Sequence, residues 1–110
     1  NNWNNWMQYI NVEPFFNLYK SKDIVYPNAI ARHFNISQKK AYELCQERVG
    51  KDKDLRKIYM IRCPICNYTL PKRFHSTAPI DTEYEYECMN CGTNFSVDLD
   101  QDIVVYFEKK

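Results

Sequence analysis

Apolar residues in the first half of the chain recur at the three- and four-residue steps of a helix. The first such group is Trp3, Trp6, Met7 and Ile10. Pro14 suits the first turn of a second helical piece. The apolar side of that piece would carry Phe15, Phe16 and Tyr19. Such stripes usually cover a core, and an exposed aromatic surface that docks a partner or a second copy of the chain is the alternative.

Two more helices are predicted between residues 27 and 48. Pro27 opens the first, Asn35 and Ile36 form a turn, and Ser37 is a favourable N-cap for the second. The second helix has its apolar stripe at Ala41, Leu44, Cys45 and Val49. Two helices joined by a short turn resemble a helix-turn-helix, and the small Ala31 allows the two helices to cross closely.

The second half of the chain changes to the alternating pattern that is typical of strands. Residues 58–61 are expected to form a strand after the polar, basic segment 51–57. Tyrosine and glutamate alternate over 82–88, so one strand face would be aromatic and the other acidic. Residues 103–107 predict a strong final strand, and 98–102 a solvated turn before it. A further alternating group is Phe95, Val97 and Leu99.

Four cysteines supply the clearest chemical signal. They form two Cys-x-x-Cys steps with 21 residues between them, namely Cys63, Cys66, Cys88 and Cys91. This spacing predicts a site in which two tight turns hold one tetrahedral metal ion through four thiolates. Four protein ligands leave no open position, so the ion would be structural. Pro64 presets the first turn, while Asn67 and Gly92 suit a positive φ after each step.

Zinc is the expected ion, and iron is the less favoured one. Two disulfides, or one redox-active Cys-x-x-Cys pair, are alternative uses of the same cysteines. His75 lies in the loop between the two steps and would be an alternative ligand, but four cysteines make it unnecessary. Cys45 shares a helical stripe with Ala41 and is therefore interpreted as a small core residue.

The two cysteine steps, followed by strands, resemble the zinc-ribbon family over residues 58–110. The preceding helices and the basic segment from Lys51 to Lys57 resemble a winged helix, with that segment as the wing. This layout is similar to the large subunit of archaeal and eukaryotic transcription factor E and to some bacterial regulators. The resemblance implies an α+β fold, with a helical winged helix-turn-helix domain at residues 1–57 and a small antiparallel β zinc ribbon at 58–110. Because the strand runs straight into Cys63, we expect the two parts to be rigidly coupled.

Composition is that of a small globular protein, with 110 residues, of which 45% are hydrophobic and 26% charged. The sequence contains no apolar run of membrane-spanning length, no visible signal peptide and an odd number of cysteines, five. These features predict a cytoplasmic or nuclear protein that is neither secreted nor bound to a membrane. A start at Asn1 rather than Met is compatible with a fragment of a longer protein or with a trimmed chain.

The charges are unevenly distributed. Residues 1–62 hold 11 Lys and Arg against six Asp and Glu, a formal charge of +5. Residues 63–110 hold four cations against eight carboxylates, a formal charge of −4. A basic half suggests contact with nucleic acid, and the acidic half then faces solvent or a different partner.

Binding of double-stranded DNA, as in a transcription-type regulator, is therefore the leading functional hypothesis. The second helix of the helix-turn-helix would enter the major groove, with Lys39 and Gln46 near base edges and Lys40 near a phosphate. Glu43 lies on the same face and opposes this contact. The full set of expected nucleic-acid contacts is Gln38, Lys39, Lys40, Tyr42, Gln46, Lys51, Lys53, Arg56 and Lys57.

The alternative is a non-enzymatic adaptor that uses the winged helix and the ribbon as docking surfaces for another protein. An exposed Trp3 and Trp6 and the acidic ribbon would favour it, and the aromatic N-terminal helices would also suit a dimer. An enzyme is not expected, because two glycines cannot build a phosphate-binding loop and no Gly-x-Ser-x-Gly or His-Glu-x-x-His element occurs. His33, beside Arg32 in the first helix of the motif, is interpreted as a partly exposed helix residue rather than a phosphate contact.

Overall fold

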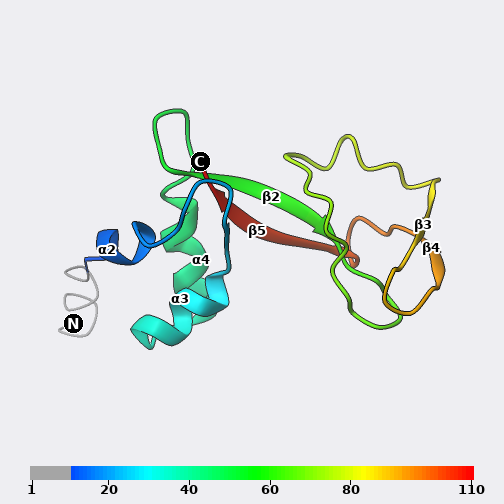
Figure 1. Ribbon diagram of the computed structural model, residues 1–110, viewed down its shortest axis with the longest axis horizontal. Coiled ribbons are helices and arrows are strands. Elements are labelled where there is room, and N and C mark those ends of the chain that lie inside the picture. The colour runs from blue at the N-terminus through cyan, green and yellow to red at the C-terminus, as the bar shows by residue number, and fades with distance from the viewer. Residues whose placement is uncertain (1–10) are drawn as a thin grey trace.

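The computed structural model describes residues 11–110, and the helix predicted around Trp3, Trp6, Met7 and Ile10 lies outside this range. The fold is small and mixes helices with antiparallel sheet, as the predicted α+β class requires. The molecule is elongated, measuring 49 Å along its longest axis and 28 and 21 Å along the other two (Figure 1). The elements are α2 (Glu13–Phe16), β1 (Ile24–Val25), α3 (Pro27–Phe34), α4 (Gln38–Gln46), β2 (Leu55–Ile61), β3 (Glu85–Glu87), β4 (Asn94–Ser96) and β5 (Ile103–Lys109).

The helices begin and end at the residues that their local chemistry favours. Pro27 lies in the first turn of α3, where its missing N–H costs nothing. Asn35 ends α3 in the left-handed conformation, with φ 55°. The Ser37 hydroxyl then accepts a hydrogen bond from the Lys40 N–H (3.1 Å) and caps α4. The start of α3 at Pro27, its end at Asn35 and the N-cap of α4 at Ser37 were predicted from the sequence. In the described part of the chain, no helix combines the length and apolarity needed to cross a membrane.

The main sheet joins strands that lie far apart in the sequence. Its order is β1-β5-β2, and both neighbouring pairs are antiparallel. β2 and β5 form a ladder of seven residue pairs, from Leu55 opposite Lys109 to Ile61 opposite Ile103. Figure 1 shows this two-stranded arm leading away from the helices. We call residues 11–54 the helical end, β2 and β5 the arm, and residues 62–102, which follow one arm strand and precede the other, the tip module.

This topology changes the interpretation of the predicted wing. Residues 51–54 are a turn and residues 55–57 begin β2, so the segment from Lys51 to Lys57 does not form a hairpin of its own. The partner of β2 is β5, at the other end of the chain, and alternation within one strand does not indicate a partner that distant. The predicted domain boundary between residues 57 and 58 falls inside β2.

Two separate cores lie at the two ends of the arm. The first core, at the helical end, consists of Phe16, Val25, Ile30, Ala31, Ala41, Cys45, Leu55 and Phe107. The second core, in the tip module, consists of Ile61, Cys63, Phe74, Ile80, Cys88, Phe95 and Val97. Because β2 contributes Leu55 to one core and Ile61 to the other, a single continuous strand connects the two.

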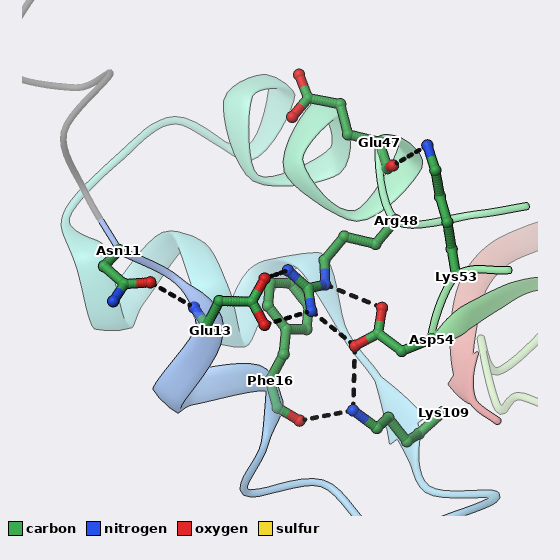
Figure 2. A network of polar contacts seen from close by, with 8 residues as sticks. All are labelled: Asn11, Glu13, Phe16, Glu47, Arg48, Lys53, Asp54 and Lys109. Atoms are coloured by element: carbon green, nitrogen blue, oxygen red, sulfur yellow. Dashed lines mark hydrogen bonds and ion pairs between the residues drawn. The ribbon is translucent and has the colours of Figure 1, made fainter.

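An ion-pair network fixes α2 to the base of the arm (Figure 2). The Arg48 guanidinium donates two hydrogen bonds to the Glu13 carboxylate (2.7 and 3.1 Å) and two to Asp54 (3.0 and 2.7 Å). It also lies over the Phe16 ring, 4.3 Å from its centroid, and Lys109 Nζ donates to Asp54 (3.1 Å). The network therefore joins α2, Arg48 after α4, Asp54 just before β2, and Lys109 of β5.

Candidate metal centre

The structure brings the four predicted cysteines together in the tip module. Their sulfur atoms all lie within 4.8 Å of one another. Sγ of Cys63 lies 3.7 Å from that of Cys91, and Sγ of Cys66 lies 3.6 Å from that of Cys88. A disulfide would require about 2.0 Å between sulfurs, and all four cysteines are free thiols. The disulfide alternative therefore does not describe this site.

The first knuckle, residues 63–68, is a tight turn closed by two backbone hydrogen bonds. The Cys63 N–H donates to the Tyr68 carbonyl (2.8 Å), and the Asn67 N–H donates to the Cys63 carbonyl (2.9 Å). Asn67 has φ 65°, the left-handed conformation that asparagine tolerates better than most residues. This geometry aims both sulfurs of the turn at one point.

The second knuckle, residues 88–93, repeats the first. The Cys88 N–H donates to the Thr93 carbonyl (2.9 Å), and the Gly92 N–H donates to the Cys88 carbonyl (2.7 Å). Gly92 has φ 75° and occupies the position that Asn67 occupies in the first knuckle. The positive φ values predicted at these two residues are confirmed, and two equivalent turns facing each other supply the four sulfurs.

The sulfur spacing fits a tetrahedral thiolate site. With metal–sulfur bonds of about 2.3 Å, the edges of such a tetrahedron measure about 3.8 Å, close to the Cys63–Cys91 and Cys66–Cys88 sulfur separations. Two N–H groups also point at the sulfurs, from Ile65 to Cys63 Sγ and from the Asn90 side chain to Cys66 Sγ, each at 3.4 Å. Donors of this kind orient thiolate ligands and spread their charge. The four cysteines could thus hold one ion such as zinc.

The four ligands differ in exposure and in acidity. Cys63 and Cys88 are fully buried in the second core, whereas Cys91 is exposed. Burial raises the pKa of Cys88 to about 11. Hydrogen bonding to Thr93, whose Oγ1 lies 3.3 Å from Cys91 Sγ, lowers the pKa of Cys91 to about 6. A hydrogen bond from Asn90 likewise lowers the pKa of Cys66.

The remaining candidate ligands lie elsewhere. Cys45 is fully buried in the first core, where burial raises its pKa to about 12. Its predicted role as a small core residue is confirmed. His75 is not part of the four-sulfur cluster. Its side chain is 61% exposed and its Nε2 lies 3.9 Å from a carboxylate oxygen of Glu108.

Glu108 is the centre of a polar contact that the sequence did not reveal. This buried residue of β5 accepts a hydrogen bond from Arg73 (2.6 Å), which follows the first knuckle. Arg73 also donates to the Lys22 carbonyl (2.7 Å), next to β1. Beside it, Phe74 exchanges two backbone hydrogen bonds with Tyr59 of β2 (2.7 and 2.9 Å). The tip module is thus fastened back onto the arm through Glu108 and Tyr59, and onto the helical end through Lys22.

The predicted nucleic-acid contacts on α4 differ in their exposure to solvent. Gln38, Lys39 and Gln46 are exposed, and Lys40 and Tyr42 are half-buried. Tyr42 packs edge-on against the Phe107 ring of β5, with centroids 5.4 Å apart.

The four cations predicted for the wing are placed differently from one another. Lys51 is exposed in the turn before β2. Lys53 donates to the Glu47 carbonyl (2.7 Å) at the end of α4 (Figure 2), and Arg56 pairs with Glu108 (3.5 Å). Lys57 Nζ lies 5.8 Å from the Tyr42 ring centroid. The structure therefore brings Lys57 next to α4, whereas Lys53 and Arg56 already have intramolecular partners.

The chain has no match among known protein families, curated proteins or solved structures. Its class is therefore defined by its own fold and site. It is a small protein of helices and antiparallel sheet, in which four cysteines on two equivalent turns could hold one metal ion.

Proposed function

We propose that the four cysteines bind one structural zinc ion and that the tip module is a zinc ribbon. Soft thiolates favour zinc or iron among common ions, and four of them suit the closed tetrahedral shell of structural zinc. Bound there, the ion would join the two knuckles across the tip module, a segment that contains few helices or strands. Its role would be to hold this segment folded.

We also propose that the helical end and the arm form a winged helix, with the tip module placed between the two strands of the wing. This interpretation is supported by the antiparallel order β1-β5-β2 and by the α3–α4 pair joined through a capped turn. It replaces the sequence-based layout, in which the wing was a separate hairpin that preceded the ribbon.

The function that this arrangement supports best is binding of double-stranded DNA, with α4 in the major groove and the arm along the backbone. The observation that carries this proposal is the surface where α4 meets the arm. Gln38 and Tyr42 line a hollow of about 270 Å³ there together with Val105 of β5, and Lys57 reaches the Tyr42 ring from β2. Lys39 is exposed on α4. A helix and a neighbouring cation placed this way match base-edge and phosphate contacts.

Fluorescence anisotropy with a random-sequence duplex tests the proposal. We expect the double variant Lys39→Ala/Lys57→Ala to bind more weakly than the wild type. Lys57 is the phosphate contact of this pair, and the loss of one phosphate contact lowers the slope of log K against log salt by about 0.9, so the slope should fall by about 1. The matched control is Lys72→Ala, which removes the same type of charge from the tip module and should leave binding unchanged.

Two results would contradict DNA binding at this surface. One is undetectable binding of the wild type to any duplex at about 50 mM salt, where phosphate contacts are strongest. The other is an equal loss of affinity in the Lys72→Ala control, which would show that the response follows net charge rather than position.

A second candidate function, docking of another protein, is supported by exposed apolar side chains on the knuckles. Ile65 of the first knuckle is 67% exposed, and Met89 of the second is 77% exposed. Large apolar residues placed beside a rigid centre are suitable anchors for a protein interface. An interface of this kind would use the tip module rather than α4, so both candidates can be tested on the same chain.

A further inference from the structure

Charge is segregated along the long axis of the molecule. The tip module holds three cations and seven carboxylates, a formal charge of −4. The helical end holds eight cations and six carboxylates, a formal charge of +2, and the arm together with Lys110 adds four cations and one carboxylate, which brings the sum to +5. Residues 1–10 contain no charged side chain. Four thiolates around a divalent ion would take the tip module to −6. The tip module is therefore acidic, and the positive charge is shared between the helical end and the arm.

The carboxylates of the tip module are not neutralised within it. Among the described residues, every ion pair uses a carboxylate of Glu13, Asp54 or Glu108, and all three lie in the helical end or the arm. No carboxylate of the tip module takes part in an ion pair in that range. On β3, Glu85 and Glu87 are exposed, so the outer face of this strand is acidic.

The two ends of one molecule cannot neutralise each other. The β2–β5 ladder of seven residue pairs separates the helical end from the knuckles (Figure 1). A ladder of seven residue pairs spans about 20 Å, which is about twice the Debye length of about 10 Å at 0.1 M salt. Arg73 of the tip module contacts the Lys22 carbonyl of the helical end, but the acidic strand β3 lies at the far end of the arm from α4 (Figure 1) and could therefore meet that helix only on another copy.

We propose that two copies of this chain associate head to tail, with the tip module of each lying against the helical end of the other. A two-fold axis makes both contacts identical, so the assembly closes at two copies. Forming the second contact is then intramolecular, which strengthens two individually weak contacts. Ile65 and Met89 extend from the acidic end, and Leu18, 77% exposed after α2, supplies apolar surface at the basic end. This inference goes beyond the proposed DNA binding and does not depend on it.

Sedimentation velocity of the metal-loaded chain over a range of salt concentrations tests the pair. At about 50 mM salt we expect a species of twice the 13.3 kDa chain mass, which dissociates as salt rises. Because the attraction is between exposed charges, the dissociation constant should increase at least about tenfold between 50 and 300 mM salt. A chain that is monomeric at every salt and protein concentration tested would overturn the proposal.

Charge reversal with mixing provides the sharper test. Glu83→Lys/Glu85→Lys/Glu87→Lys makes the acidic strand face basic, and Lys39→Glu/Lys40→Glu/Lys51→Glu makes the helical end acidic. We expect each triple variant alone to be monomeric, because its two ends then repel. An equimolar mixture should recover the pair, because each end again meets its opposite. Persistence of the pair in either variant alone, or failure of the mixture to associate, would overturn the head-to-tail contact.

Controls separate this result from misfolding and from loss of DNA binding. Asp52→Lys adds a cation to an exposed position of the helical end and should keep or strengthen the pair. The neutral variant Glu83→Gln/Glu85→Gln/Glu87→Gln should weaken the pair even if charge reversal there prevents folding. Because it leaves α4 and the arm intact, its affinity for a duplex should not fall. If the two copies fail to associate, the test of DNA binding is therefore unaffected.

Discussion

Replacing the four cysteines one at a time with serine should rank them by burial. Cys63 is fully buried in the second core, whereas Cys91 is exposed at the surface of the second knuckle. After Cys91→Ser, water can take the vacant coordination position and solvate the new hydroxyl. After Cys63→Ser, the hydroxyl is enclosed by apolar neighbours and water has no access. The two variants lose the same ligand type in different surroundings.

The expected difference follows from two separate contributions. Structural zinc in small domains contributes about 10–16 kcal/mol, so one ligand in four accounts for about 3–4 kcal/mol, or roughly 10²–10³-fold in metal affinity. At the Cys63 position the serine oxygen keeps the Ile65 N–H as a donor, but the buried O–H lacks an acceptor, which adds about 1–3 kcal/mol. We therefore expect Cys63→Ser to bind metal roughly tenfold or more weakly than Cys91→Ser.

Competition with a chromophoric chelator measures metal affinity for each variant, and amide hydrogen exchange locates the unfolding. In both variants, protection should be lost first in residues 62–102. Amides of α3 and α4 should stay protected longer, because their core contains no knuckle residue. Cys45→Ala, the control, should retain full metal content while destabilising the helical end.

Two outcomes would refute this reasoning. If Cys63→Ser and Cys91→Ser lost metal affinity equally, burial would not govern the ligand contributions. If Cys45→Ala released the metal, the four-sulfur assignment itself would be wrong.

Two further predictions concern the Arg48 network and the knuckle turns. A hydrogen bond from Arg48 lowers the pKa of Glu13, and although burial raises the pKa of Asp54, hydrogen bonds from Arg48 and Lys109 lower it overall. The network should therefore stabilise the helical end fully at a pH above the ordinary pKa values, which are 4.5 for Glu13 and 3.8 for Asp54. This stabilisation should be lost as the pH falls through the lowered pKa values of the two carboxyl groups in the folded protein. Denaturant unfolding should show that Arg48→Met lowers the free energy of unfolding by about 1 kcal/mol at pH 7 and by less near pH 3. A difference in stability that does not change with pH would contradict this pH dependence. A Cβ at position 92 would meet no atom within 4 Å, but Gly92 has φ 75°, which strains any other residue. Thermal unfolding should therefore show that Gly92→Ala lowers the free energy of unfolding by about 1–2 kcal/mol, whereas Asn67→Gly should be neutral or stabilising. An unchanged stability of Gly92→Ala would refute the backbone strain.

The local features of this fold were predictable because they depend on neighbouring residues. Pro27, Asn35 and Ser37 define the ends of α3 and α4 through φ restriction, left-handed conformation and side-chain capping. The cysteine spacing likewise predicted which four sulfurs meet, and Asn67 and Gly92 predicted the knuckle conformation.

Features that depend on distant partners were not predictable. Ile103 to Phe107 was expected to be the last strand of a separate ribbon domain, yet β5 pairs with β2 and places Phe107 in the first core. Nothing in a single strand indicates which of several strands will pair with it. The Arg48–Glu13 and Arg73–Glu108 contacts, each 35 positions apart, were missed for the same reason. The placement of the proposed wing follows from that one strand pairing.

X-ray absorption at the metal edge of the purified chain, with elemental analysis of the same sample, tests the central claim most directly. The account predicts one zinc ion per chain, surrounded by four sulfur atoms at about 2.3 Å. A chain without bound metal, or an ion with a mixed nitrogen and oxygen shell in place of four sulfurs, would contradict it.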